Sequence, residues 1–398
     1  MNSTNRHGAY YWIGLAIGMV LLTLLVARPE RPPEMTLVTP TPEPIVPTRT
    51  PQPVVESTAI GSATPAAVAP ATTVPEATDA SPTPALPLDP ALDRIGLAGA
   101  LSDIEQGIEL GLRFGHFTFW RTWPSPPEVP NLTIWQTVRL GQVGEEIEWP
   151  AVANLIEQTI EGNPGSYWMV GNEPDVPWQD NATAEEYAEA YHDIYTFIKE
   201  RDPSAKIGAG GVALPTPLRL AYLDRVLQHY RRTYGEPMPA DLWAVHLFVL
   251  REEEGGWGIG IPPGMTETAG QLYEVEDHGD IELMKAYTVA FRDWMAANGY
   301  GDKPLAVTEF GILLPEDYGF PPEFVQNYLV ESFEFFRTAT GDSGLAADGG
   351  RLVQFAFWYS IYDEGDYKTG NLFDGERGVL TPLGETFIQY VDGLMNAP

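Results

Sequence analysis

The stretch SYWMVGNEPD, residues 166–175, places four apolar residues just before Asn172 and Glu173, and a proline follows. The apolar run has the length of a buried parallel strand, and the proline ends it. The stretch PLAVTEFG, residues 304–311, repeats this arrangement with Glu309 near its end. A carboxylate directly after an apolar strand is hard to place unless it projects into a cavity. We therefore expect both strands to end at a functional site.

Six further apolar, β-rich runs surround these two strands, and longer helical patterns separate them from Ala91 onward. The predicted strands cover residues 94–98, 112–120, 132–140, 167–171, 206–210, 242–248, 305–310 and 352–359. The predicted helices cover residues 149–161, 217–234, 281–298 and 323–338, and one more starts at Thr183, where Glu186 completes a capping box. Eight βα units in roughly 300 residues predict an α/β fold of the (β/α)8 TIM-barrel type. The glycine-rich first turn of a doubly wound sheet is not found.

The active site of a TIM barrel lies at the carboxyl ends of its strands. Glu173 on the fourth strand and Glu309 on the seventh are therefore predicted to converge across the barrel mouth. Paired carboxylates are what glycosidic cleavage requires, because one donates a proton to the leaving oxygen while the other attacks the anomeric carbon or activates water. This chemistry uses no metal and no cofactor, and we expect neither.

The composition excludes several classes of partner and site. The chain has no cysteine, which excludes disulfides and thiolate metal sites, and its six histidines are scattered without a paired spacing. The part from Ala91 onward keeps 48 of the 55 acidic and 19 of the 23 basic residues, a formal charge of −29. Such a domain would repel nucleic acid. We expect a monomer whose partner is a carbohydrate substrate.

The first ninety residues have a different character. Residues 10–27, YYWIGLAIGMVLLTLLVA, are uncharged and just long enough to cross a bilayer. Residues 29–90 contain no Phe, Tyr or Trp and hold 16 of the 37 prolines, so they cannot bury a core. We expect a membrane anchor over residues 1–28 (alternatively a signal peptide), a disordered Pro/Thr-rich linker over 29–90, and a catalytic domain over 91–398. This order predicts a catalytic domain that is anchored to the membrane at the cell surface and lies outside the cell, or alternatively a secreted domain.

Asn172-Glu173-Pro174 at the end of the fourth strand, with Thr308 to Gly311 at the end of the seventh, resembles the large clan of retaining (β/α)8 glycoside hydrolases. The two motifs most resemble those of family 39-like and family 128-like members. The segment NLFDGERGVLTPLGETF, residues 371–387, is similar to their last loop and helix. The resemblance implies that Glu173 is the acid/base and Glu309 the nucleophile. It also implies that Asn172 binds the sugar hydroxyl next to the anomeric carbon.

The same resemblance implies further substrate-binding residues. His246 would support the nucleophile or contact sugar, unless it is a core histidine, and Phe248 lacks the hydroxyl that a tyrosine would offer there. Trp358 would be the platform for a pyranose ring, followed by a non-proline cis peptide, unless it is a core aromatic. Trp120 and Arg121 at the end of the second strand are candidates for a second sugar contact. Trp257 lies in the long loop over residues 251–279, which is expected to form a wall of the cleft.

The leading hypothesis is thus retaining hydrolysis of a β-linked polysaccharide or oligosaccharide through a covalent glycosyl-enzyme. The sugar is open among β-glucan, xylan, mannan and a self-made exopolysaccharide. Transglycosylation would use the same residues. A non-catalytic glycan-binding surface protein would need the aromatic residues but not the carboxylate pair.

Overall fold

The computed structural model describes residues 90–141 and 149–396. The predicted anchor and the linker up to residue 89 lie outside the described residues. Within the described part of the chain, no helix is both long and apolar enough to span a membrane.

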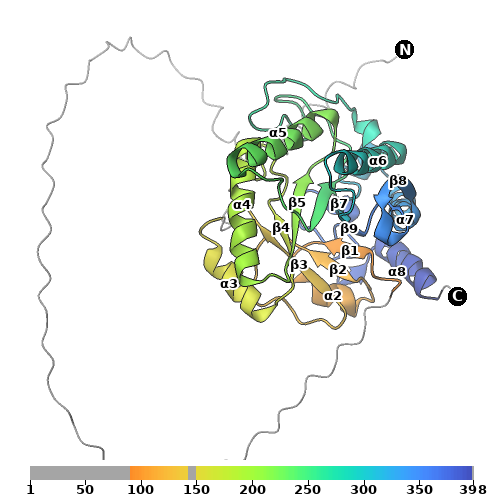
Figure 1. Ribbon diagram of the computed structural model, residues 1–398. Coiled ribbons are helices and arrows are strands. Elements are labelled where there is room, and N and C mark those ends of the chain that lie inside the picture. Colours follow the sequence, from red (N-terminus) through yellow and green to blue (C-terminus); the bar gives the residue numbers. More distant parts are fainter. Residues whose placement is uncertain (1–89, 142–148, 397–398) are drawn as a thin grey trace, which may run out of the picture. The chain divides into compact units, whose positions relative to one another are not determined.

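Eight parallel strands close into a barrel, as predicted (Figure 1). They are β1 Ile95–Ala98, β2 His116–Thr118, β3 Thr133–Val138, β4 Tyr167–Val170, β5 Lys206–Val212, β6 Leu242–His246, β7 Leu305–Phe310 and β9 Phe355–Tyr359. The last strand, β9, pairs in parallel with both β1 and β7 and so closes the ring. Each predicted strand overlaps one of these eight, which confirms the TIM-barrel fold.

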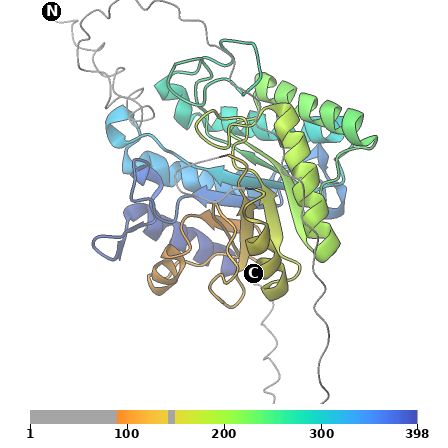
Figure 2. The ribbon, with the colours of Figure 1, turned by 90° about the vertical axis from the view of Figure 1, so that its left-hand side faces the viewer.

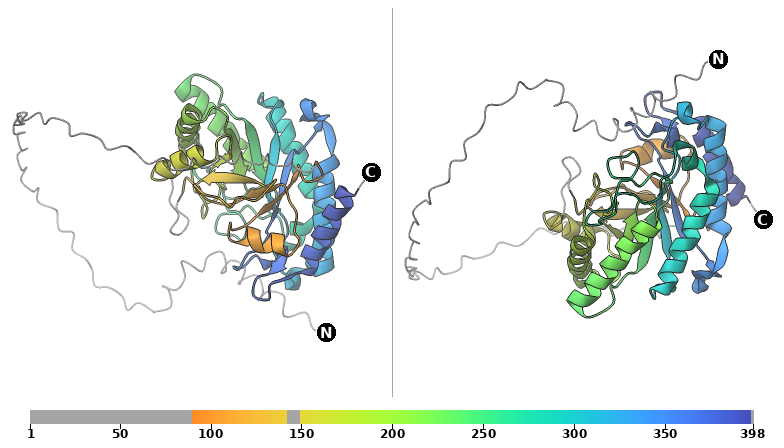
Figure 3. Two further views of the ribbon diagram at one scale, coloured as in Figure 1. Left: turned by 90° about the horizontal axis from the view of Figure 1, so that it is seen from below. Right: turned by 90° about the horizontal axis from the view of Figure 1, so that it is seen from above.

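Helices surround the barrel on its outside, as the two views of Figure 3 show. They are α2 Asp103–Glu109, α3 Ala153–Gly162, α4 Ala184–Arg201, α5 Pro217–Tyr234, α6 Ile281–Ala297, α7 Pro322–Thr338 and α8 Pro382–Met395. The capping box predicted at Thr183 and Glu186 opens α4. Short 3-10 turns follow at η1 Val275–Gly279, η2 Glu316–Tyr318, η3 Ala346–Asp348 and η4 Lys368–Gly370, and the short strands β8 Thr340–Leu345, β10 Phe373–Asp374 and β11 Val379–Leu380 lie outside the barrel.

Two connections depart from a regular βα unit. Residues 119–132, between β2 and β3, contain no helix, and this segment remains an irregular loop at the carboxyl end of β2. The connection from β6 to α6 is long and lies at the top of Figure 2. An isolated antiparallel β-bridge between Glu253 and Ala269 joins two parts of this loop. Both loops belong to the end of the barrel that carries active sites in this fold.

Large side chains fill the other end of the barrel interior. Trp135 and Tyr167 stack with ring centroids 4.5 Å apart, and Phe355 and Phe357 meet Trp135 edge to face. With His116 among them, these rings occupy the amino-terminal half of the strands. Because these side chains fill the amino-terminal half of the barrel interior, the space for a cavity lies toward the carboxyl ends of the strands.

Candidate active site

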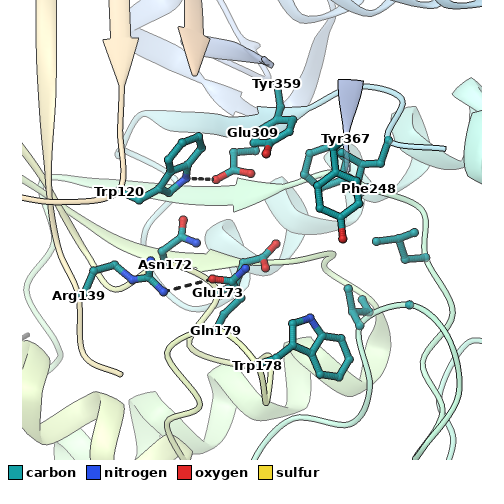
Figure 4. Close-up of a pocket in the computed structure, with 14 residues that line it drawn as sticks. Trp120, Arg139, Asn172, Glu173, Trp178, Gln179, Phe248, Glu309, Tyr359 and Tyr367 are labelled. Atoms are coloured by element: carbon teal, nitrogen blue, oxygen red, sulfur yellow. Dashed lines mark hydrogen bonds between the residues drawn. The ribbon is translucent and has the colours of Figure 1, made fainter. Parts of the chain in front are cut away.

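A cavity of about 290 Å³ opens at the carboxyl ends of the strands (Figure 4). Its lining joins the ends of β2, β3, β4, β6, β7 and β9, and comprises Trp120, Arg139, Asn172, Glu173, Trp178, Gln179, Phe248, Leu250, Gly258, Ile259, Glu309, Leu313, Tyr359 and Tyr367. Both predicted catalytic glutamates therefore face the same cavity. Its size is near the lower end of ligand pockets, which span roughly 300–1,000 Å³.

Glu309 reaches the cavity because of an irregularity in β7. Ala244 pairs with Ala306, but His246 pairs with Glu309, so Thr308 is an extra residue on β7. Strict alternation from the inward-facing Ala306 would turn Thr308 inward and Glu309 toward the helices. The bulge reverses that alternation and points the Glu309 carboxylate into the barrel mouth.

The Glu309 carboxylate is held through one oxygen. The Trp120 indole N–H donates to Oε1 at 2.6 Å, and His246 Nε2 lies 3.6 Å from the same oxygen. Neither contact engages Oε2. The side chain is only 9% exposed, so these contacts orient a nearly buried carboxylate.

Glu173 follows the end of β4 in an unusual backbone conformation. Its φ of +46° lies in the left-handed region, and Gly171 two residues earlier has φ +80°. The Glu173 amide donates to the Gly211 carbonyl at 3.0 Å, which ties this turn to the end of β5. The turn brings Glu173 Oε1 to 3.0 Å from Nδ1 of His246.

His246 therefore lies between the two carboxylates, beneath the cavity and almost fully buried. Burial lowers its pKa, but the charge of Glu309 and the hydrogen bond to Glu173 outweigh that effect and raise the pKa above its usual value. Burial and the charge of Glu173 raise the pKa of Glu309, and the charge of His246, the Trp120 hydrogen bond and the charge of Arg139 offset only part of this increase. His246 is thus suited to carry a positive charge that keeps Glu309 ionised.

This arrangement predicts the effect of His246→Asn on the pH profile. Glu309 must be ionised to attack, so kcat/KM should fall as the pH decreases through the raised pKa of Glu309, above the usual 4.5. Asparagine removes the cation that lowers this pKa, so the acid limb should move to higher pH. A kcat/KM profile measures the shift, with His229→Asn, a substitution of a half-buried histidine outside the cavity that contacts Glu189, as the control. An acid limb that stays in place or moves to lower pH contradicts the assignment.

Asp180 organises the opposite wall of the cavity. Its carboxylate accepts the backbone N–H of Asn172 at 2.8 Å and that of Leu140 at 3.1 Å, and it pairs with Arg139 Nε at 2.5 Å. Arg139 also donates to Gln179 at 3.2 Å, the contact drawn in Figure 4. The ends of β3 and β4 are thereby fixed to each other, with Asn172 at the cavity edge.

A second buried network lies behind Glu173. Arg219 on α5, with no exposed surface, pairs with Asp175 at 2.5 Å and with Glu252, and donates to the Ile259 carbonyl at 2.9 Å. Burial raises the pKa of Asp175 to about 6 even though Arg219 lowers it. Arg219 thus connects the turn after Glu173 to the long loop after β6.

Replacing Arg219 with methionine should lower the free energy of unfolding by about 3–5 kcal/mol, because it leaves two buried carboxylates without their cation. Urea denaturation measures the loss. Arg225→Met on the same helix, where the side chain is exposed and bonds only a backbone carbonyl of Gly264, is the matched control and should change stability little. Equal effects of the two substitutions would show that the network does not stabilise the fold.

Of the other predicted binding residues, some line the cavity and some do not. Trp120 lines the cavity, whereas Arg121 is exposed and lines a neighbouring cavity. Trp257 packs half-buried against the core, and the loop reaches the cavity through Gly258 and Ile259 instead.

Trp358 does not line the cavity. It is fully buried on the outer face of β9, packs against Phe310 and donates to the Gly370 carbonyl at 2.8 Å. Phe357 faces the barrel interior, so alternation turns Trp358 outward and the next residue, Tyr359, into the mouth. The cis peptide is likewise one residue later than predicted, at Tyr359–Ser360. Of these two aromatic residues, it is Tyr359 and not Trp358 that faces the cavity.

Sequence reasoning missed Arg139, Trp178, Tyr359 and Tyr367, all of which line the cavity. Counting the alternation of β9 from its inward residues would have found Tyr359. Trp178 lies five residues after Glu173 on the same loop, a position that could have been examined. Arg139 and Tyr367 carry no local signal. Within residues 90–141 and 149–396, no group of three or more His, Cys, Asp or Glu is placed to hold a metal ion.

Comparison with known proteins finds similarity in structure only. No protein-family model matches the chain, and no curated protein sequence matches it. Among solved structures, a GH128 (subgroup II) endo-β-1,3-glucanase from Sorangium cellulosum is 15% identical, with 75% of this chain and 98% of that chain covered and a TM-score of 0.48. The corresponding enzyme from Pseudomonas viridiflava is 17% identical over 74% and 96%, with a TM-score of 0.49.

A GH128 (subgroup III) curdlan-specific exo-β-1,3-glucanase from Blastomyces gilchristii, solved with glucose, is 18% identical over 75% of this chain and 98% of that chain, with a TM-score of 0.49. Similarity at this level concerns the fold alone.

Proposed function

We propose that this protein is a retaining glycoside hydrolase acting on a β-linked glycan, with Glu309 as nucleophile and Glu173 as acid/base. The observation that supports this most directly is the contact of one buried histidine, His246, with both carboxylates at the mouth of the barrel. A single imidazole ring spans the gap between them. Two carboxylates of this kind can divide the two tasks of glycosidic cleavage between them.

In the first step, Oε2 of Glu309, the oxygen that Trp120 and His246 leave unengaged, attacks the anomeric carbon. The bond between that carbon and the glycosidic oxygen breaks, and the proton of Glu173 passes to the departing oxygen. In the second step, Glu173 takes a proton from water, the water oxygen attacks the anomeric carbon, and Glu309 leaves as a carboxylate. His246 balances the negative charge on Glu309 while it is free.

Tyr359, Trp120 and Trp178 supply the flat apolar surfaces against which sugar rings pack. Asn172, fixed through its backbone by Asp180, is at the edge where a hydroxyl of the attacked sugar would lie. The lining carries both glutamates and one arginine, which suits a neutral glycan. The membrane anchor over residues 1–28 and the placement outside the cell belong to this proposal as well.

The test is incubation of the purified protein with a panel of β-1,3-glucan, β-1,4-glucan, xylan and mannan, with product lengths and the anomeric configuration followed by proton NMR. We expect cleavage of at least one glycan with the β configuration retained in the first product. An initially inverted product would mean that Glu309 activates water, a mechanism in which the carboxyl groups lie about 6.5–9.5 Å apart rather than 5–5.5 Å. Binding without turnover on every glycan would favour the non-catalytic surface protein.

A further inference from the structure

A second cavity, of about 560 Å³, adjoins the first. It is formed by residues 99–102 after β1 and by residues 119–127, the loop without a helix after β2. Trp120 lines both cavities, so the two lie next to each other at this residue.

Trp123 gives this cavity its character. It is 46% exposed, whereas five of the ten tryptophans among the described residues are buried. An exposed indole beside Phe119 and the hydroxyls of Ser102 and Ser125 combines an apolar face with polar groups. The lining contains one charged side chain, Arg121, and no carboxylate. This is the chemistry that a neutral sugar ring requires, with one flat apolar face and a rim of hydroxyls.

The loop that carries Trp123 is held in place before any ligand binds. The Trp123 backbone N–H donates to the Gln136 side chain at 2.8 Å, and the Thr122 hydroxyl donates to the Thr137 carbonyl at 3.1 Å. Both partners belong to β3 of the barrel. The backbone that carries the indole is therefore ordered in advance, which lowers the ordering cost of binding.

The position of the cavity relative to the two glutamates indicates on which side of the cleaved bond it lies. The residue shared by the two cavities, Trp120, bonds Glu309, which attacks the anomeric carbon. Trp178 lines the first cavity from the segment that follows Glu173, the residue that protonates the departing oxygen (Figure 4). With the proposed roles of Glu309 and Glu173, the departing part of the glycan would lie toward Trp178, and the part bonded to Glu309 would extend toward Trp120.

We propose that the Trp123 cavity binds a sugar residue of the glycan on the non-reducing side of the sugar that Glu309 attacks. This proposal rests on the proposed function, because the roles of Glu173 and Glu309 set the direction. It assigns the enzyme to glycans that continue beyond the attacked sugar. Release of single sugars from a non-reducing end is then not the main reaction.

The test uses the full-length protein and ladders of β-1,3- and β-1,4-linked gluco-oligosaccharides from the disaccharide upward. For the wild type, kcat/KM should rise with each added unit until the Trp123 cavity is filled. Trp123→Ala should lose that last gain, a roughly tenfold decrease for the long members, whereas Trp123→Phe should keep most of it because it retains a flat ring. Leu272→Ala, which removes an equally exposed side chain outside both cavities, is the matched control.

Affinity electrophoresis in gels containing soluble β-1,3-glucan or β-1,4-glucan gives a second readout that needs no turnover. If the wild type cleaves no member of either ladder or the panel, the proposed function fails, and with it the direction assigned to the cavity. If the wild type cleaves but Trp123→Ala keeps the full gain with length and the full retardation in gels, the cavity is not a sugar site. Melting curves of each variant check that the exposed residue can be replaced without unfolding.

Discussion

Glu309→Ala is expected to lower turnover roughly 10⁴- to 10⁶-fold on every substrate, including aryl glycosides with activated leaving groups. Alanine removes the only proposed nucleophile, so no glycosyl-enzyme can form, and a better leaving group does not compensate. Because burial raises the pKa of Glu309, its removal should not unfold the protein. Steady-state rates on a polysaccharide and on an aryl glycoside measure the loss.

The matched control is Glu316→Ala, which removes an exposed glutamate from the same connection after β7. It should leave both rates close to the wild-type values. Azide added to Glu309→Ala can occupy the space of the missing carboxylate, and any product formed should then have the inverted configuration. Ordinary turnover of natural glycan by Glu309→Ala would remove Glu309 from the mechanism.

Glu173→Ala should behave differently according to the leaving group. On natural glycan, where the departing oxygen must be protonated, we expect a loss of roughly 10²- to 10⁴-fold. On an activated aryl glycoside the first step should persist, and the glycosyl-enzyme should accumulate because no base activates water. Azide needs no base, so it should restore turnover and give a glycosyl azide of retained configuration.

A pre-steady-state burst of aryl alcohol, mass spectrometry of the trapped intermediate and NMR of the azide product measure these three effects. If azide rescue with retention occurred in Glu309→Ala instead, the two roles would be exchanged. Equal losses on all substrates, with no burst and no rescue, would mean that Glu173 is not a general acid/base and that His246 or another group supplies the proton.

The fold was largely predictable because its signal is local. Each strand is a short apolar run, and each long helix has a marked beginning, such as Thr183 with Glu186. The alternation of the two elements then leaves few topologies. The sequence did not show whether residues 119–132 form a helix or a loop, because they lack a periodic pattern. In the structure they form a loop.

The meeting of Glu173 and Glu309 at one cavity was predictable for the same reason, but the residues around them were not. Glu173 and Glu309 end apolar runs, whereas the bulge at Thr308 that turns Glu309 inward is visible only through the pairing of β7 with β6. The choice of Trp358 over Tyr359 failed because the end of an apolar run was used without counting which face each residue occupies. Asp180 and Arg139 act through contacts across 41 residues of chain, for which a single sequence contains no local sign.

The left-handed backbone conformation of Glu173 lowers the stability of the fold while it places the carboxylate at the cavity. An asparagine or glycine would adopt a φ of +46° more easily than a glutamate does, and a residue held in this region costs of order 1–3 kcal/mol. Glu309 adds a buried carboxylate whose pKa is raised by burial. A redesign that optimised folding alone would therefore replace these residues first. Any attempt to make this protein more heat-resistant should leave this part of the barrel unchanged and substitute residues on the outer helices instead.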